Sequence, residues 1–269
     1  MASVAAPLTI LHDLPIPATE VTLYVPGFTK SADDEATFGG WRPAHATLAE
    51  RGAWGSKMAG YAWESGAQRI PTLTLALWAR SAWRLARGAA AVTPPGVALF
   101  ATECALEYGA WMLREYHAAR KVAQADAGTL AATLAGRREE HATVRVVAHS
   151  LGCRHVLEAA KELPPEAAPD EVHLCAPAFA EGEYAAELAR VPSGTWHVYY
   201  ARSDAVLGFL FWAAEGLGFG RAEAVGRGGL ADAYPRVRAH DVERHFGFRV
   251  HGEYSRRFPA FAVTDATAD

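Results

Sequence analysis

Short apolar runs along the chain alternate with longer segments in which apolar residues recur every three or four positions. The short runs predict buried strands, and the longer segments predict amphipathic helices. Strands are predicted at 7–20 (an opening strand or hairpin broken by two prolines), 21–25, 58–63, 144–148, 171–176, 195–200 and 240–248. Helices are predicted at 41–54 with an end near Gly52, and at 73–91, 96–122, 125–139, 151–163 and 181–190. Strands that alternate with helices favour an α/β fold with a mostly parallel sheet flanked by helices.

Residues 67–140 hold more helix than a crossover between two parallel strands requires. Such a crossover needs about a dozen residues, whereas three helical patterns follow one another here, with a break at Pro94 and Pro95. One helix is the expected crossover, and the rest is a helical insertion before the strand at 144–148. The insertion is expected to be a cap over the functional site, an interface with another chain, or an enlarged helical layer on the sheet. Residues 1–269 are taken as a single domain, because this length suits one large α/β domain.

Composition and charge narrow the class of protein. The formal net charge is −4, so the chain has no excess of basic residues that could bind a phosphate backbone. Nucleic acid is therefore not expected as a partner. The three cysteines, Cys104, Cys153 and Cys175, are too few and too scattered for a disulfide framework. They are expected to be buried thiols in a reducing compartment, which favours a cytoplasmic location. The N-terminus does not resemble a signal peptide, and no apolar run is long and clean enough to span a bilayer.

The strongest chemical signal lies where the strand at 144–148 meets the helix at 151–163. The turn reads Ala148-His-Ser150-Leu-Gly152, a serine with a small residue on each side. In a nucleophile elbow, such a turn lifts the serine hydroxyl above the end of the sheet, and the small residues let the strand and helix backbones approach. The alternative is an ordinary strand-to-helix turn in which Ser150 caps the helix.

A nucleophilic serine needs a base and an acid, which follow it on such a sheet in the order Ser, Asp or Glu, His. Asp204 comes shortly after the strand at 195–200, and His251 lies in a glycine-bearing loop after the last predicted strand. The carboxyl ends of parallel strands meet at one edge of the sheet. We therefore expect Ser150, Asp204 and His251 to converge there, where the imidazole takes the serine proton and the carboxylate orients the imidazole.

Other residues compete for these two roles. His245 is the rival base, although it falls inside the predicted strand at 240–248. Glu181 and Glu183 are rival acids, but carboxylates at a helix start also have a structural explanation in the helix dipole. Three further histidines are expected to be structural, the first because it should point away from the serine and the others because they lie in strands: His149, His173 and His197.

Two backbone N–H groups are expected to bind the negative charge that develops on a substrate oxygen. One belongs to Leu151, directly after the serine. The other belongs to Phe28, after the strand at 21–25 and a turn that contains Gly27. No dinucleotide or phosphate loop and no metal-ligand spacing is found, so neither a cofactor nor a metal is expected.

Four stretches together resemble the α/β-hydrolase superfamily, and most of all its bacterial esterase/lipase-like branch of the "domain of unknown function 900" type. They are Val25-Pro-Gly-Phe28, Ala148-His-Ser-Leu-Gly152, Tyr200-Ala-Arg-Ser-Asp204-Ala-Val-Leu207 and His251-Gly-Glu-Tyr254. The resemblance covers residues 20–66 and 142–256 and leaves out 67–140. The chain departs from the family pattern at Ala148, which replaces a glycine, and at Val25-Pro26, where many members have an apolar residue and a histidine.

The resemblance implies a serine hydrolase, a carboxylesterase or lipase-like enzyme, that cleaves a carboxylic ester or related acyl compound through an acyl-enzyme on Ser150. The expected partner is therefore a small-molecule acyl substrate. Two alternatives remain open. The same three residues could serve an acyltransferase or thioesterase, or the fold could be a non-catalytic scaffold that binds a partner through 67–140.

Overall fold

The computed structural model describes residues 8–12, 19–28, 37–66, 94–191, 193–215, 223–247 and 249–263. The helix predicted at 73–91 lies outside these ranges, as do the two prolines of the opening segment and residues 67–93 of the insertion.

Seven strands in the described part of the chain form one sheet in the order β1-β3-β2-β4-β5-β6-β7. Six of them run parallel, and β1 is added antiparallel along the edge of β3. The prediction of an α/β fold with a mostly parallel sheet is thereby confirmed. The strands are β1 (Leu8–His12), β2 (Glu20–Val25), β3 (Met58–Tyr61), β4 (Thr143–His149), β5 (Glu171–Cys175), β6 (Thr195–Tyr200) and β7 (Val237–Asp241).

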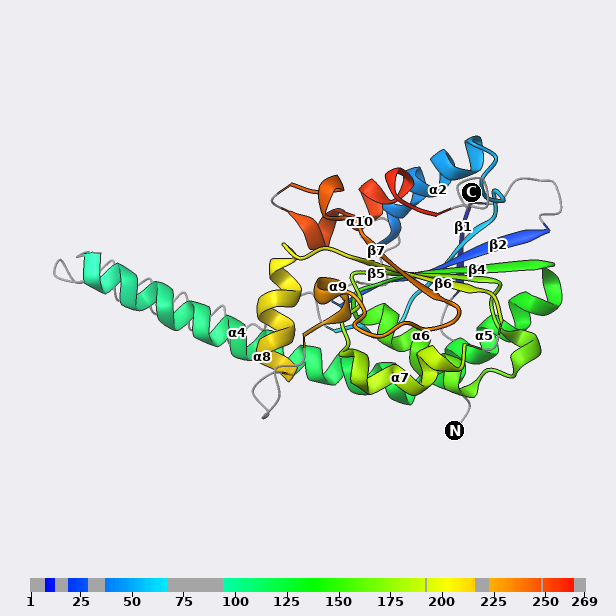
Figure 1. Ribbon diagram of the computed structural model, residues 1–269. Coiled ribbons are helices and arrows are strands. Elements are labelled where there is room, and N and C mark those ends of the chain that lie inside the picture. The colour runs from blue at the N-terminus through cyan, green and yellow to red at the C-terminus, as the bar shows by residue number, and fades with distance from the viewer. Residues whose placement is uncertain are drawn as a thin grey trace.

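Helices cover both faces of the sheet (Figure 1). One face carries α2 (Trp41–Glu50) and α10 (Val250–Arg257), and the other carries α4 (Pro94–Ala125), α5 (Ala127–Glu140), α6 (Leu151–Glu162) and α7 (Glu181–Ala189). Shorter helical turns complete the connections: η1 (Pro165–Ala167), the π-helical η2 (Leu207–Phe211), α8 (Trp212–Glu215), α9 (Val225–Gly228), η3 (Glu243–His245) and η4 (Phe258–Ala260).

The core is centred on β4, which lies between two parallel neighbours and is covered by helices on both faces. Its apolar residues are almost fully buried, as a strand with both faces covered requires: Val144, Val146, Val147 and Ala148. Arg145 is the polar exception, and its guanidinium donates to Glu171 (Nε to Oε2, 2.5 Å) while lying 4.5 Å from the centre of the Trp54 ring. Cys153 and Cys175 are free buried thiols, whereas the side chain of Cys104 lies outside the described part.

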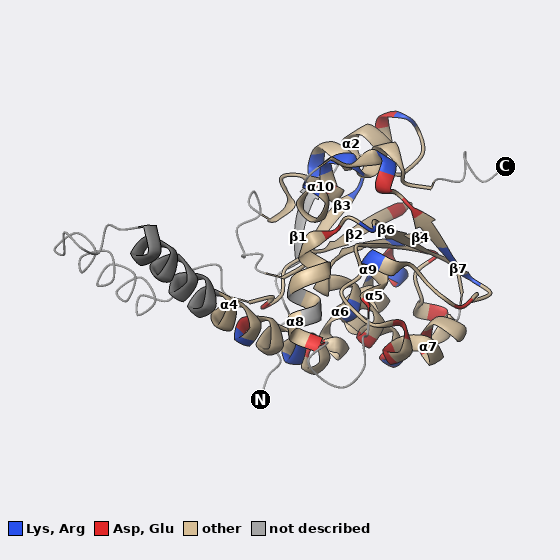
Figure 2. Cartoon of the chain, turned by 60° about the vertical axis from the view of Figure 1, so that its left-hand side comes forward, with Lys and Arg blue, Asp and Glu red and all other residues tan. Residues whose placement is uncertain are grey.

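The two predicted helices at 96–122 and 125–139 correspond to α4 and α5. Helix α5 packs on α6 and β4, and α4 packs on α6 and α8. Figure 1 shows that α4 also extends beyond the ends of the strands, and in Figure 2 its inner part lies beside α8. Helix α5 therefore lies beside α6 on the sheet, whereas the inner part of α4 packs outside α6.

A partly buried cluster of charges around Arg154 holds α4 against α6. Arg154 on α6 is 1% exposed and donates to Glu183 on α7 (Nη2 to Oε2, 2.7 Å), and it lies 3.6 Å from Glu215 on α8. Arg120 on α4 pairs with the same two carboxylates. Because a buried charge without a partner is costly, these contacts favour one fixed position of α4 relative to the helix that follows Ser150.

Three histidines on neighbouring strands stack on the face of the sheet that carries α2 and α10, where His173 contacts Trp54 and Phe258. The ring centre of His197 lies 5.1 Å from that of His173 and 5.3 Å from that of His240. The Tyr199 hydroxyl donates to His173 Nδ1 over 2.9 Å. Burial lowers the pKa of His173 to about 4, and burial together with the neighbouring His197 lowers the pKa of His240 to about 4. The prediction that His173 and His197 pack in the core is confirmed.

This stack should make the fold sensitive to mild acid. A histidine in the unfolded chain has a pKa near 6.5, so between pH 6.5 and about pH 4 the unfolded state binds more protons and stability falls as the pH falls. For His173 alone the difference corresponds to about 3 kcal/mol. We expect the free energy of unfolding in urea to depend less steeply on pH in this range for His173→Asn than for the unaltered chain. The exposed His117→Asn serves as control, and equal slopes for all three proteins would contradict the prediction.

Candidate active site

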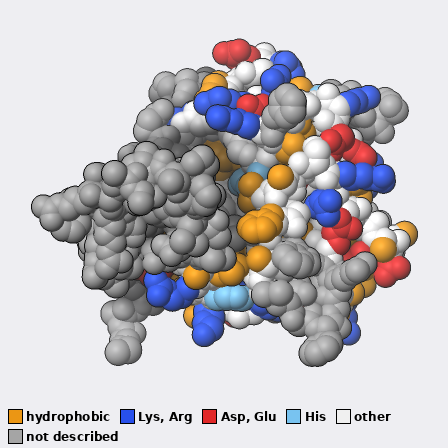
Figure 3. All heavy atoms as spheres, turned by 90° about the vertical axis from the view of Figure 1, so that its left-hand side faces the viewer, with side chains coloured by type: hydrophobic (Ala, Val, Ile, Leu, Met, Phe, Trp, Pro, Cys, Tyr) orange, Lys and Arg blue, Asp and Glu red, His pale blue; other side chains and the backbone are white. Residues whose placement is uncertain are grey.

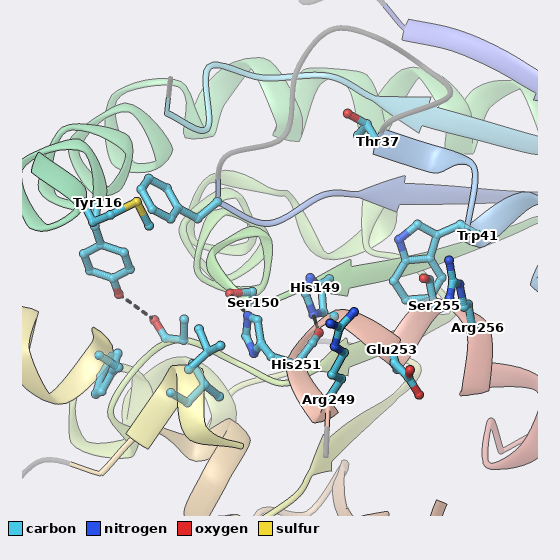
Figure 4. Close-up of a pocket in the computed structure, with 18 residues that line it drawn as sticks. Thr37, Trp41, Tyr116, His149, Ser150, Arg249, His251, Glu253, Ser255 and Arg256 are labelled. Carbon is cyan, nitrogen blue, oxygen red and sulfur yellow. Dashed lines mark hydrogen bonds between the residues drawn. The ribbon is translucent and has the colours of Figure 1, made fainter. Parts of the chain in front are cut away.

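The loops that follow β2, β4, β5, β6 and β7 meet at the carboxyl edge of the sheet, where open α/β sheets place their binding sites. A pocket of about 510 Å³ lies at this edge (Figure 4). Ser150 follows β4 directly and Asp204 follows β6, and His251 comes after β7. Ser150 and His251 line the pocket, so the side chains that carry the candidate chemistry come from three separate strand ends.

Ser150, His251 and Asp204 form one hydrogen-bonded chain. His251 Nε2 lies 3.0 Å from Ser150 Oγ, and His251 Nδ1 lies 2.7 Å from Asp204 Oδ2. Asp204 is fully buried, and its other carboxylate oxygen accepts the backbone N–H of Leu207 over 3.0 Å. Because a carboxylate faces Nδ1, the imidazole carries its proton there and Nε2 is left to accept the serine hydrogen.

The turn that holds Ser150 is sterically tight. Ser150 has a φ of +53°, a conformation that costs energy for any residue with a side chain. Its side chain makes no capping hydrogen bond with α6 and faces His251 instead. A Cβ atom at Gly152 would lie 2.5 Å from the carbonyl oxygen of Pro26, and one at Gly27 would lie 2.8 Å from Ser150 Cβ. Glycine at both positions therefore allows α6 and the end of β2 to close around the serine.

His251 lies in a different element from the one predicted. The last strand ends at Asp241 rather than continuing to 248, and His251 is the second residue of α10 rather than part of a loop. The chain leaves the sheet early because the Asp241 carboxylate accepts the backbone N–H of Glu243 (3.0 Å) and closes a turn. The helix that follows holds the His251 backbone more firmly than a loop would.

His149 contributes to the site in a way that the sequence did not indicate. It lines the pocket, and its Nε2–H donates to the backbone carbonyl of His251 over 2.9 Å. The two imidazole rings lie 4.8 Å apart, centre to centre. His149 therefore ties the end of β4 to the first turn of α10. No local signal could have revealed this, because the partner is a backbone group more than one hundred residues away.

The rival base, His245, and the rival acids, Glu181 and Glu183, interact with residues outside the candidate site. The ring of His245 lies in η3, not in a strand, and packs 5.6 Å from the ring of Phe261. Glu181 accepts hydrogen bonds from Tyr234 and from the backbone of residues 231 and 232, and Glu183 pairs with Arg154. Within the described part of the chain, none of these rivals forms a hydrogen bond with Ser150 or His251.

Both residues expected to supply oxyanion donors lie beside the serine. Leu151 is the first residue of α6, so its N–H has no acceptor within the helix. Phe28 follows Gly27, whose backbone packs on Ser150, and its ring lies 5.7 Å from that of Tyr116. Trp63 Nε1–H donates to the carbonyl of Pro26 over 2.9 Å, which holds this turn in place.

The pocket has two unlike arms, one on each side of Ser150 (Figure 4). The arm toward α4 and η2 is mainly apolar and is lined by Phe28, Met112, Tyr116, Val206, Leu207 and Phe211. The arm toward α2 and α10 is mainly polar and is lined by Thr37, Trp41, His149, Arg249, Glu253, Ser255 and Arg256. Figure 3 shows the face of the molecule at this end, where hydrophobic side chains gather near a histidine.

Two other kinds of functional feature are absent from the described part of the chain. Among the described residues, no helix combines the length and apolar character that a membrane span requires. The same residues contain no group of three or more His, Cys, Asp or Glu side chains placed to hold a metal ion. Comparison of the chain with models of known protein families gives no match, and comparison with curated proteins gives none either.

Proposed function

We propose that the protein is a serine hydrolase of the α/β-hydrolase type, which cleaves a carboxylic ester or related acyl compound through an acyl-enzyme on Ser150. The observation that carries the proposal is the hydrogen-bonded chain from buried Asp204 through His251 to Ser150. The serine stands at the wall of a pocket, in a strained turn before a helix. This combination is what acyl transfer to a serine hydroxyl requires.

In the proposed reaction, Ser150 Oγ attacks the substrate carbonyl carbon as His251 Nε2 takes the hydroxyl proton. Asp204 keeps the imidazole in the required tautomer and stabilises the imidazolium that forms. The imidazolium then gives its proton to the leaving oxygen, and an acyl-enzyme remains. Water attacks that ester with His251 as base, which releases the acid and restores the serine.

The negative charge on the substrate oxygen is proposed to be bound by the backbone N–H groups of Leu151 and Phe28. Loss of one donor of this kind typically costs about 3–4 kcal/mol of transition-state stabilisation. The Leu151 N–H also lies at the positive end of the α6 dipole. The glycine before Phe28, which packs against Ser150, supports the assignment of the second donor.

The proposal is tested by reaction with a fluorophosphonate probe and by hydrolysis of para-nitrophenyl butyrate. Ser150→Ala should abolish labelling and lower kcat by about 10⁴-fold or more. Ser203→Ala, at an exposed serine that lies in the loop before Asp204, should behave like the unaltered protein. Labelling that survives in Ser150→Ala would remove Ser150 from its proposed role.

Two further results would point to the alternatives. An acyl ester as the main product in the presence of an alcohol or thiol would identify a transferase. An inert Ser150 in the unaltered protein, combined with a stable complex in pull-down experiments, would identify a non-catalytic scaffold.

A further inference from the structure

The polar arm of the pocket carries an excess of positive charge. Arg249 and Arg256 both line it, and of the described lining residues Glu253 alone is acidic. In the close-up, the two arginines and Glu253 lie on the side of His251 that faces away from Tyr116 (Figure 4). The arm is therefore suited to an anion, whereas the opposite arm is suited to an apolar group.

Neither arginine is engaged by another described residue in a hydrogen bond or an ion pair. Their neighbour on the same helix differs, because Arg257 pairs with Glu253 (Nε to Oε2, 3.6 Å). That pair also partly neutralises the acidic residue of the arm. Arginine guanidinium groups bind carboxylates and phosphates through paired N–H donors, so two arginines that line one pocket, without partners among the described residues, are suited to bind an anion.

The position of the base decides which part of the substrate lies in each arm. His251 delivers its proton to the leaving oxygen, so the leaving group must lie next to the imidazole. His251, Arg249 and Arg256 belong to the same short segment, at the start of α10 and within its last turn. The leaving group thus extends toward the arginines, and the acyl group extends across Ser150 toward Tyr116 and Phe211.

We infer that the substrate is an ester of an apolar acyl group whose leaving group bears a carboxylate or phosphate bound by Arg249 and Arg256. This inference rests on the proposed function and goes beyond it by defining the substrate class. The same arginines also define the specificity, because a neutral leaving group would leave them without a partner in the arm.

The test compares hexanoate esters of para-hydroxybenzoate, of its neutral methyl ester and of para-hydroxyphenyl phosphate. We expect kcat/KM to be about tenfold higher for the two anionic esters, which is the effect of charge-assisted hydrogen bonds in a partly exposed site. In an Arg249→Gln, Arg256→Gln double variant the ratio of anionic to neutral kcat/KM should fall to about one. Arg238→Gln, at an exposed arginine of β7 that is not among the residues lining the pocket, is the control and should keep the original ratio. All three arginines are exposed, so these variants should fold.

The outcomes separate this inference from the proposed function. Hydrolysis of the neutral ester with an anionic-to-neutral ratio near one would overturn the inference and leave the hydrolase proposal standing. A preference that persists in the double variant would overturn the role of the two arginines. Failure to hydrolyse any of the esters, with no fluorophosphonate labelling, would overturn both. A higher ratio for one anion than for the other would identify the group that the arm binds.

Discussion

Asp204→Asn is expected to lower kcat for para-nitrophenyl butyrate about 10⁴-fold without unfolding the protein. The asparagine amide has almost the same size as the carboxylate, and its oxygen can still accept the Leu207 N–H. Its nitrogen, however, would donate to His251 Nδ1 and hold the imidazole in the tautomer that carries a proton on Nε2. That tautomer cannot take the proton from Ser150, so the hydroxyl would no longer be activated.

The matched control for this variant is Glu181→Gln. The Glu181 carboxylate follows β5, the neighbouring strand, and accepts its hydrogen bonds from residues 231–234 rather than from the base. It should retain kcat within a few-fold while losing some stability. If Asp204→Asn kept most of the activity, or if Glu181→Gln lost as much, Asp204 would not be the group that orients His251.

Gly152→Ala is expected to lower the free energy of unfolding by about 2–3 kcal/mol, and the Tm by roughly 4–12 °C. The added Cβ would lie 2.5 Å from the carbonyl oxygen of Pro26 and 2.6 Å from that of Val25. These are backbone atoms of the end of β2, so they cannot move aside as a flexible side chain could. Relief of the clash would push α6 away from β2, and the hydrolysis rate should fall together with stability.

The control for the glycine substitution is Gly136→Ala in α5. A Cβ at Gly136 would meet nothing within 4 Å. Alanine in a helix interior should therefore raise stability by about 0.5–1 kcal/mol. Thermal unfolding of both variants gives the comparison. Equal stability of Gly152→Ala and the unaltered protein would show that the approach of α6 to β2 does not depend on glycine.

The architecture was largely predictable because the periodicity of apolar residues is a local property. The predicted strands at 21–25, 58–63, 144–148, 171–176 and 195–200 fall within two residues of observed ones. The opening strand or hairpin predicted at 7–20 contains β1, and residues 13–18 of it lie outside the described part. The strand predicted at 240–248 is wrong because a side chain, Asp241, closes a turn that a pattern of apolar residues does not report. The meeting of Ser150, Asp204 and His251 also followed from a simple rule, since parallel strands end at one edge of the sheet.

The details of the pocket depend instead on which helices pack at that edge. His149 reaches the His251 carbonyl only because α10 lies on the same face of the sheet as α2, across the end of β4. Phe211 lines the apolar arm because η2, the helical turn that follows Asp204, brings its side chain to this edge.

The sequence by itself determined the alternation of strands and helices and the tight turn around Ser150, because both are encoded in consecutive residues. Only the tertiary structure decided that His251 rather than His245 meets the serine, and that arginines line one arm of the pocket while apolar residues line the other. Those contacts join residues about one hundred positions apart, such as Ser150 and His251. They are set by the packing of whole elements on the sheet, which no local pattern specifies.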